Sequence, residues 1–258
     1  MNRSGEWFGA QALNSVRHRM ASRHAVDIAA ARSSLITLQP MNWVGIEAAI
    51  AKVPLARGYR FELLDRSEIT ALVAAVKSWF PEISVGAASC YLREDFFRDD
   101  VYFADKPEND VLVVLIKRGA KLAGLFSCQR DRNALSLYAR LGVIAPEHRG
   151  MRLSRVFPLL AESIGRRIGM GMIYGMATLK MPHVQRAFEK LGWQLIGITP
   201  GYDREMITPG VVKRVYEAVY AKVLVAETNL LRPHARNLTA RTRAFFRLLF
   251  PRSRLQQT

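Results

Sequence analysis

The sequence predicts an α/β (α+β) fold in which strands and helices follow one another as a meander rather than as repeated βαβ units. Half of the 258 residues are hydrophobic, which is ample for a core. Residues 111–117 and 121–130 are strand-like runs on either side of a short turn containing Gly119, as in a hairpin. Residues 135–144 form a third such run, and apolar positions at helical spacing follow it.

The remaining elements are bounded by turn or capping residues. The spacing of Asp65 and Glu68 is that of a capping box, which marks a helix start. Before the hairpin we expect a short helix at 44–50, a strand at 59–64, a helix at 69–80 and a helix around 91–97. After residue 168 we expect a strand containing Tyr174, a strand at 194–198, a turn-rich loop at 200–210 and a long strand at 211–225.

A turn of sequence Pro-Glu-His-Arg-Gly, residues 146–150, connects the strand at 135–144 to the helix that follows. The apolar positions of this helix recur between Leu153 and Ile168. A strand that leads directly into a helix leaves several backbone N–H groups unpaired, with the positive end of the helix dipole behind them. The turn therefore predicts a phosphate-binding site.

This order of elements resembles the GNAT superfamily of acyl-CoA-dependent N-acyltransferases, whose pyrophosphate loop has the form Arg/Gln-x-x-Gly-x-Gly/Ala. In residues 149–154, Arg149 matches the first position, Arg152 replaces the middle glycine, and Ser154 is still small. Residues 188–193, Phe-Glu-Lys-Leu-Gly-Trp, look like the family's Tyr-Glu-Lys-Leu-Gly-Phe ending. The resemblance covers roughly residues 59–225. It implies a GNAT-like fold with a mixed, mostly antiparallel central sheet flanked by helices.

The resemblance also implies three parts of the chain: an N-terminal extension (1–57), a GNAT-like acyltransferase domain (58–227) and a basic C-terminal extension (228–258). The formal charge is +16, and residues 229–258 hold seven basic residues and no acidic one. In residues 239–250 arginines alternate with aromatic and aliphatic residues, which indicates a helix. This helix either docks on the domain by its aromatics or binds an anionic surface.

The two cysteines, Cys90 and Cys128, make no disulfide framework and lack metal-ligand spacing. The first residues show no apolar segment of a signal peptide, and the longest apolar run, at 111–116, is too short to cross a bilayer. We therefore expect a cytoplasmic enzyme without a metal. The sequence leaves its oligomeric state open.

The resemblance implies transfer of an acetyl or other acyl group from CoA to an amine by direct attack in a ternary complex. Acetyl-CoA or another acyl-CoA would be the donor, and a small-molecule or peptide amine the acceptor. The residues expected to bind the donor lie at the end of one strand, in the loop and on a later helix: Gly142, Val143, Ile144, Arg149, Gly150, Met151, Arg152, Leu153, Ser154 and Gln185.

The chemistry needs a base for the amine and a proton donor for the leaving thiolate. Glu147, between the strand and the loop, is the candidate base. Phe188 stands where the family often has a tyrosine and has no proton to give, so Tyr138 is the first candidate for the acid and Tyr174 the second.

Residues 94–110 hold seven acidic residues against two basic ones. This excess suggests that Glu94, Asp95 and Asp99 attract a cationic amine substrate. A solvated acidic face, or an internal partner for the basic tail, explains the same pattern equally well.

Two alternatives from other functional classes remain open. A long-chain acyltransferase would take its acyl group from acyl carrier protein or a long acyl-CoA, with the run Met170, Met172, Met176 and Met181 lining an apolar tunnel; the same methionines could instead fill a core. A non-catalytic GNAT-fold module would bind nucleic acid or an anionic membrane through the basic tail. Phe188 and Arg152 permit this second alternative.

Overall fold

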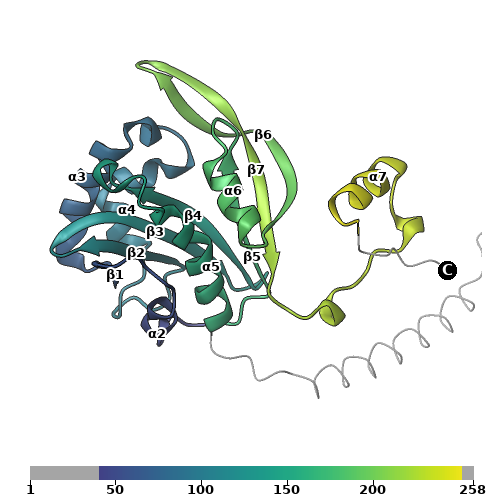
Figure 1. Cartoon of the computed structure of the whole chain (residues 1–258), viewed down its shortest axis with the longest axis horizontal. Helices are drawn as coiled ribbons and strands as arrows, with labels where there is room; N and C mark the ends of the chain where they lie inside the picture. Colours follow the sequence, from purple (N-terminus) through teal and green to yellow (C-terminus); the bar gives the residue numbers. More distant parts are fainter. Residues whose placement is uncertain (1–40, 252–258) are drawn as a thin grey trace, which may run out of the picture. The chain divides into compact units, whose positions relative to one another are not determined.

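The computed structural model describes residues 41–251, and these contain one seven-stranded sheet (Figure 1). The strands lie in the order β1-β2-β3-β4-β5-β7-β6. Only β4 and β5 are parallel, and every other neighbouring pair is antiparallel. This confirms the predicted mixed, mostly antiparallel sheet. The strands are β1 Tyr59–Leu63, β2 Val111–Arg118, β3 Lys121–Asp131, β4 Ser136–Ile144, β5 Met172–Thr178, β6 Gln194–Thr208 and β7 Val211–Val223.

Helices cover both faces of the sheet. The α-helices are α2 Ile46–Ala51, α3 Ile69–Trp79, α4 Glu94–Asp99, α5 Val156–Arg167, α6 His183–Lys190 and α7 Ala240–Leu249. Short 3₁₀ turns that matter below are η2 Pro81–Ser84, η3 Ala87–Leu92, η4 Pro146–His148 and η5 Leu153–Arg155. Residues of α2, α5 and α6 pack into one core cluster, and residues of α3 and α4 into a second.

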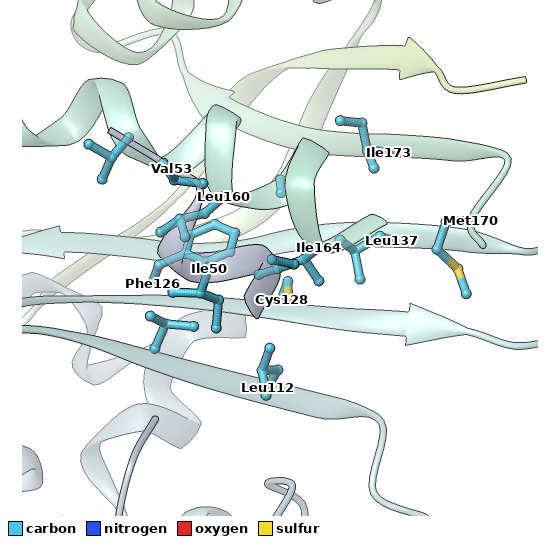
Figure 2. Close-up of a cluster of buried hydrophobic side chains, with 14 of the residues drawn as sticks. Ile50, Val53, Leu112, Phe126, Cys128, Leu137, Leu160, Ile164, Met170 and Ile173 are labelled. Atoms are coloured by element: carbon cyan, nitrogen blue, oxygen red, sulfur yellow. The ribbon is translucent and has the colours of Figure 1, made fainter. Parts of the chain in front are cut away.

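Strand β2 shows why the sheet needs helices on both sides. Its residues Leu112, Val114 and Ile116 belong to the first core cluster, while Val113 and Leu115 belong to the second. Successive side chains of a strand point to opposite faces, so an uninterrupted apolar run is buried from both sides. Figure 2 shows the first cluster, in which Ile50 of α2 and Leu160 of α5 lie near the sheet.

Several local patterns were predicted correctly. The hairpin of β2 and β3 turns at Gly119, which has a φ of 58°. The capping box also forms: the Asp65 side chain accepts a hydrogen bond from the Ser67 N–H, and the Glu68 carboxylate accepts one from the Asp65 N–H. Helix α3 then begins at Ile69.

Two element predictions were wrong. The single helix expected around 91–97 is two pieces, η3 and α4, because Arg93 between them has extended backbone (φ −127°, ψ 134°). The loop expected at 200–210 is mostly strand, because β6 stays paired with β7 as far as Thr208. The turn-forming residues near Pro200 produce a shift of register between Thr199 and Asp203 instead of ending the strand.

The ends of the chain bear on the expected division into three parts. Residues 1–40 of the expected N-terminal extension and residues 252–258 of the C-terminal one lie outside the described residues. Trp43, Ile46 and Ile50 are buried in the first core cluster, so packing begins on the N-terminal side of residue 57. No helix within residues 41–251 combines the length and apolar character that a membrane crossing requires.

Helix α7 lies where the sequence predicts a helix, but its aromatic residues are not buried. Phe246 and Phe250 are half-buried and contact each other, with ring centroids 5.0 Å apart. Phe245 and Leu248 are 48% and 74% exposed. The expectation of a helix docked through its aromatics is therefore met only in part.

Replacing Leu160 by alanine should destabilise the protein by about 2–5 kcal/mol, because the side chain is fully buried between α5 and the sheet and its removal leaves a cavity. Urea denaturation measures the loss. Leu248→Ala on α7 is the matched control and should change the free energy of unfolding by less than about 0.5 kcal/mol. Similar losses for the two variants would contradict this description of the core.

Candidate active site

Strand β4 separates from its parallel neighbour halfway along its length. Its pairing with β5 covers only Ser136 to Ala139, opposite Met172 to Gly175. On the other side, Ala139 pairs with Cys128 and Leu141 pairs with Ser127, so Arg140 is an extra residue in a β-bulge. Beyond Ala139, the edge of β4 that faces β5 has no strand partner among the described residues.

The end of β4 lies directly against helix α5. A Cβ atom at Gly142 would lie only 2.4 Å from the ring of Phe157, so only glycine permits this close approach. Val143 is buried in the second core cluster, and Ile144 is half-buried against the first. The three residues expected to face the donor thus form a strand end that is packed on both sides.

The loop after β4 is anchored by its first arginine. The Arg149 guanidinium donates to the carbonyl oxygen of Ile144 at 3.3 Å and to that of Trp79, at the end of α3, at 3.1 Å. Before it, the buried His148 shares a hydrogen bond with the Tyr59 hydroxyl at 3.0 Å. The Arg149 side chain therefore holds the start of the loop in place between the end of β4 and the end of α3.

Arg152 stands where the GNAT loop pattern has glycine, and its backbone adopts a conformation that favours glycine. Its φ is 59° and its ψ is 17°, in the left-handed region, and Gly150 has a φ of 84°. Within residues 41–251, the N–H groups of Gly150, Met151 and Arg152 have no protein acceptor. Such unpaired N–H groups ahead of a helix form an anion-binding concavity, and here they precede η5 and α5. The loop thus fits a pyrophosphate despite the missing glycine.

Within the loop, Leu153 is buried while Met151 is 52% exposed and Ser154 is exposed. Gln185 on α6 donates from its amide nitrogen to the carbonyl oxygens of Thr178 at 3.1 Å and Met181 at 3.2 Å. This side chain therefore ties α6 to the end of β5.

Phe188 lies over the point where β4 and β5 separate. It is buried and stacks on Tyr220, with centroids 5.3 Å apart. Its Cζ atom would lie 3.0 Å from a Cβ at Gly175, the residue that pairs with Ala139 in the last parallel pair. The ring is therefore beside the separation point and brings no hydroxyl to it.

On the opposite face of the sheet, Tyr138 and Tyr174 lie beside the point where β4 and β5 separate. The Tyr138 and Tyr174 rings stack with centroids 5.0 Å apart and an interplanar angle of 14°. Burial raises the pKa of Tyr138 far above its usual value, and the nearby Tyr202 and Glu217 raise it further. Tyr138 is thus a protonated phenol at neutral pH.

Glu217 is a candidate residue that the sequence analysis missed. It lies on β7, pairs with Thr178 of β5 and Thr199 of β6, and has no ion-pair partner in the described part of the chain. Burial first, and then the carboxylates of Asp203 and Glu205, raise the pKa of Glu217 to about 7. A carboxyl group with this pKa can exchange a proton at neutral pH. A lone Glu in a strand gives no sequence signal of such a role.

The other predicted acidic residues lie on η4 and on or beside α4. Glu147 is exposed on η4, at the end of β4 that leads into the loop. On and beside α4, three ion pairs take up the expected substrate-binding carboxylates: Glu94 with Arg98, Asp95 with Arg93, and Asp99 with Lys106. This pairing favours the interpretation of the acidic segment as a solvated face.

No protein-family model and no curated protein sequence matches this chain. Solved structures do match it. One is yncA, a putative acetyltransferase from Salmonella typhimurium with its cofactor acetyl-CoA: TM-score 0.53, 13% identity, covering 69% of this chain and 98% of that one. Another is RimL, the ribosomal L7/L12 alpha-N-protein acetyltransferase: TM-score 0.51, 11% identity, covering 68% and 99%.

A third is spermidine N-acetyltransferase from Vibrio cholerae in complex with CoA and spermine, with a TM-score of 0.50 and 14% identity, covering 65% of this chain and 96% of that one. At such identities the likeness shows the fold, which is the GNAT fold predicted from the sequence.

Glu217→Gln should change how stability depends on pH. The folded pKa of about 7 lies above the ordinary value of 4.5, so the folded protein holds this proton more tightly than the unfolded chain does. The resulting stabilisation is complete below the unfolded pKa and is lost as the pH rises through the folded pKa. The neutral glutamine avoids this loss.

Urea denaturation between about pH 4 and about pH 8 tests this. The Glu217→Gln variant should become progressively more stable relative to wild type as the pH rises. Glu47→Gln, on the exposed side of α2, is the control. A constant difference between Glu217→Gln and wild type across this range would refute the assigned shift.

Proposed function

We propose that this GNAT-fold chain is an N-acyltransferase that moves an acetyl or other acyl group from CoA to an amine in a ternary complex. The observation that carries the proposal is the arrangement along β4. The strand leaves its parallel partner after Ala139, and within ten residues the chain reaches a loop whose N–H groups at 150–152 lack acceptors among the described residues. The free strand edge can pair with the amides of an extended pantetheine arm, and the N–H groups of the loop can bind the pyrophosphate that follows it in CoA.

The donor is held mainly by main-chain groups. The free edge of β4 at Gly142, Val143 and Ile144 takes the pantetheine, and the loop from Arg149 to Ser154 takes the pyrophosphate. Arg152 and Arg155 add positive charge beside the loop. When bound, the acyl-CoA supplies a thioester carbon that an amine can attack. The proposal includes no metal.

Two protons must move. The attacking nitrogen forms a bond to the acyl carbon, the carbon–sulfur bond breaks, the nitrogen loses a proton and the thiolate gains one. Tyr138, which burial keeps protonated, donates to the thiolate. Glu217, with its pKa of about 7, accepts the proton from the amine. In this assignment Glu217 replaces the exposed Glu147 as the base.

The similar structures support the reaction class but not one acceptor. Their names include a polyamine acetyltransferase and a protein N-terminal acetyltransferase. A small-molecule amine is therefore one acceptor class that this fold accommodates. The long-chain alternative finds no support in the methionine run, since Met170 is buried in the core while Met181 is 48% exposed.

Calorimetric titration with acetyl-CoA, a long-chain acyl-CoA and CoA tests the proposal. Binding of acetyl-CoA with release of CoA in the presence of an amine is the expected result. Failure of all three to bind at millimolar concentration would leave only a non-catalytic module, and the basic α7 segment would then become the first place to look for its partner.

Gly150→Asp should weaken CoA binding by about 1–3 kcal/mol, because it places a carboxylate beside the pyrophosphate. Gly150 has a φ of 84°, which Asn and Asp tolerate better than other residues, so Gly150→Asn is a control with the same backbone cost and no charge. Calorimetry should show a much smaller loss for Asn. Equal losses would mean that the loop does not face a phosphate.

Tyr138→Phe should lower kcat by about two orders of magnitude and leave the affinity for CoA nearly unchanged, because only the proton donor is removed. Tyr174→Phe is the matched control, since it removes the hydroxyl of the stacked partner. Steady-state kinetics measures both. A Tyr138→Phe variant as fast as wild type would return Tyr138 to a packing role.

A further inference from the structure

A pocket of about 500 Å³ opens on the same face of the sheet as the tyrosines. The half-buried residues Arg140, Gln129 and Cys90 are among those that line it. Gln129 pairs with Tyr138 across β3 and β4, and paired residues point to the same face. Arg140 is near enough to influence the pKa values of both Tyr138 and Tyr174. The pocket therefore adjoins the proposed proton donor.

Arg140 is the extra residue of the β4 bulge, and the bulge turns its side chain toward this pocket. The guanidinium donates to the Gln129 side-chain oxygen at 2.7 Å and contacts the Cys90 sulfur at 3.7 Å. It also lies 5.8 Å and 5.6 Å from the ring centroids of Tyr91 and Phe96. An arginine has five N–H donors, so these contacts leave donors unused.

No carboxylate among the described residues neutralises the charge of Arg140. Within residues 41–251 it forms no ion pair. The other charged groups around the pocket are either compensated or exposed: Arg93 pairs with Asp95, Asp110 pairs with Arg130 and Arg132, and Asp100 and Glu108 are exposed. Exposed charges contribute little to binding, whereas a half-buried guanidinium retains most of its attraction for an anion.

We infer that the acceptor is an amino acid, whose carboxylate binds the Arg140 guanidinium while its amine reaches the acyl group beside Tyr138. The inference rests on the proposed acyl transfer and adds the substrate class. A guanidinium and a carboxylate match each other in two parallel hydrogen bonds. An unpaired guanidinium next to the amine site also disfavours purely cationic amines. The volume of the pocket leaves room for a side chain.

Amino acids and their carboxamides test this directly, because each pair differs in charge and hardly in shape. With acetyl-CoA as donor and a panel of L-amino acids, wild type should show at least about a ten-fold higher kcat/KM for the acid than for the amide of the preferred side chain. Arg140→Gln should raise KM for the acid by about ten-fold or more with kcat largely kept. It should raise KM for the amide far less than for the acid. Arg140→Lys should fall between Arg140→Gln and wild type for the acid.

Arg57→Gln, an exposed arginine between α2 and β1, is the control and should match wild type. Calorimetry with CoA shows whether each variant still folds and binds the donor. Equal rates for acids and amides, or equal losses for both in Arg140→Gln, overturn the inference while the acyltransferase proposal stands. Turnover of a diamine such as cadaverine but of no amino acid overturns it too.

Absence of CoA binding would instead overturn the proposed function. If CoA binds without any turnover, titration of the amino acids into the CoA complex decides the inference. Binding of the acids that Arg140→Gln abolishes supports it, and failure of every acid to bind overturns it.

Discussion

The bulge at Arg140 in β4 is the constraint on which the candidate site depends. Before the bulge Leu137 and Ala139 face the first core cluster, and after it Leu141 and Val143 face the second. One extra residue has thus reversed the faces of the strand. The pairing with β5 ends at the same place. The strand leaves β5 while both of its faces stay packed, so the free edge of β4 lies inside a rigid frame.

This frame also fixes the loop that follows. Gly142 lets Phe157 of α5 approach β4, and Arg149 bonds to the carbonyl of Trp79 at the end of α3, on the other face of the sheet. The loop is therefore held from both helical layers. Arg152 can keep a left-handed backbone, at a cost of about 1–2 kcal/mol for a residue with a side chain, because these contacts determine the path of the chain around it.

The sequence predicts what depends on neighbours along the chain. The Asp65 capping box and the turn at Gly119 are examples, and both form as predicted. It could not predict what depends on register between strands. Glu217 acquires its high pKa first from burial and then from Asp203 and Glu205, and these carboxylates reach it only through the irregular pairing of β6 with β7. The turn-forming residues near Pro200 concealed that pairing.

Arg140 and Glu217 lie on the two sides of the stacked Tyr138 and Tyr174 rings and differ in the sign of their charge. Arg140 lies toward the β3 side of Tyr138, with a positive charge that no carboxylate of the described residues pairs, and Glu217 lies on β7 beside two further carboxylates. A molecule that carries both charges is attracted by opposite charges on the two sides of Tyr138, its anionic end by Arg140 and its amine by Glu217. The charge proposed to select the acceptor, on β4, and the group proposed to deprotonate its amine, on β7, therefore lie on the same face of the sheet, on either side of the proposed proton donor.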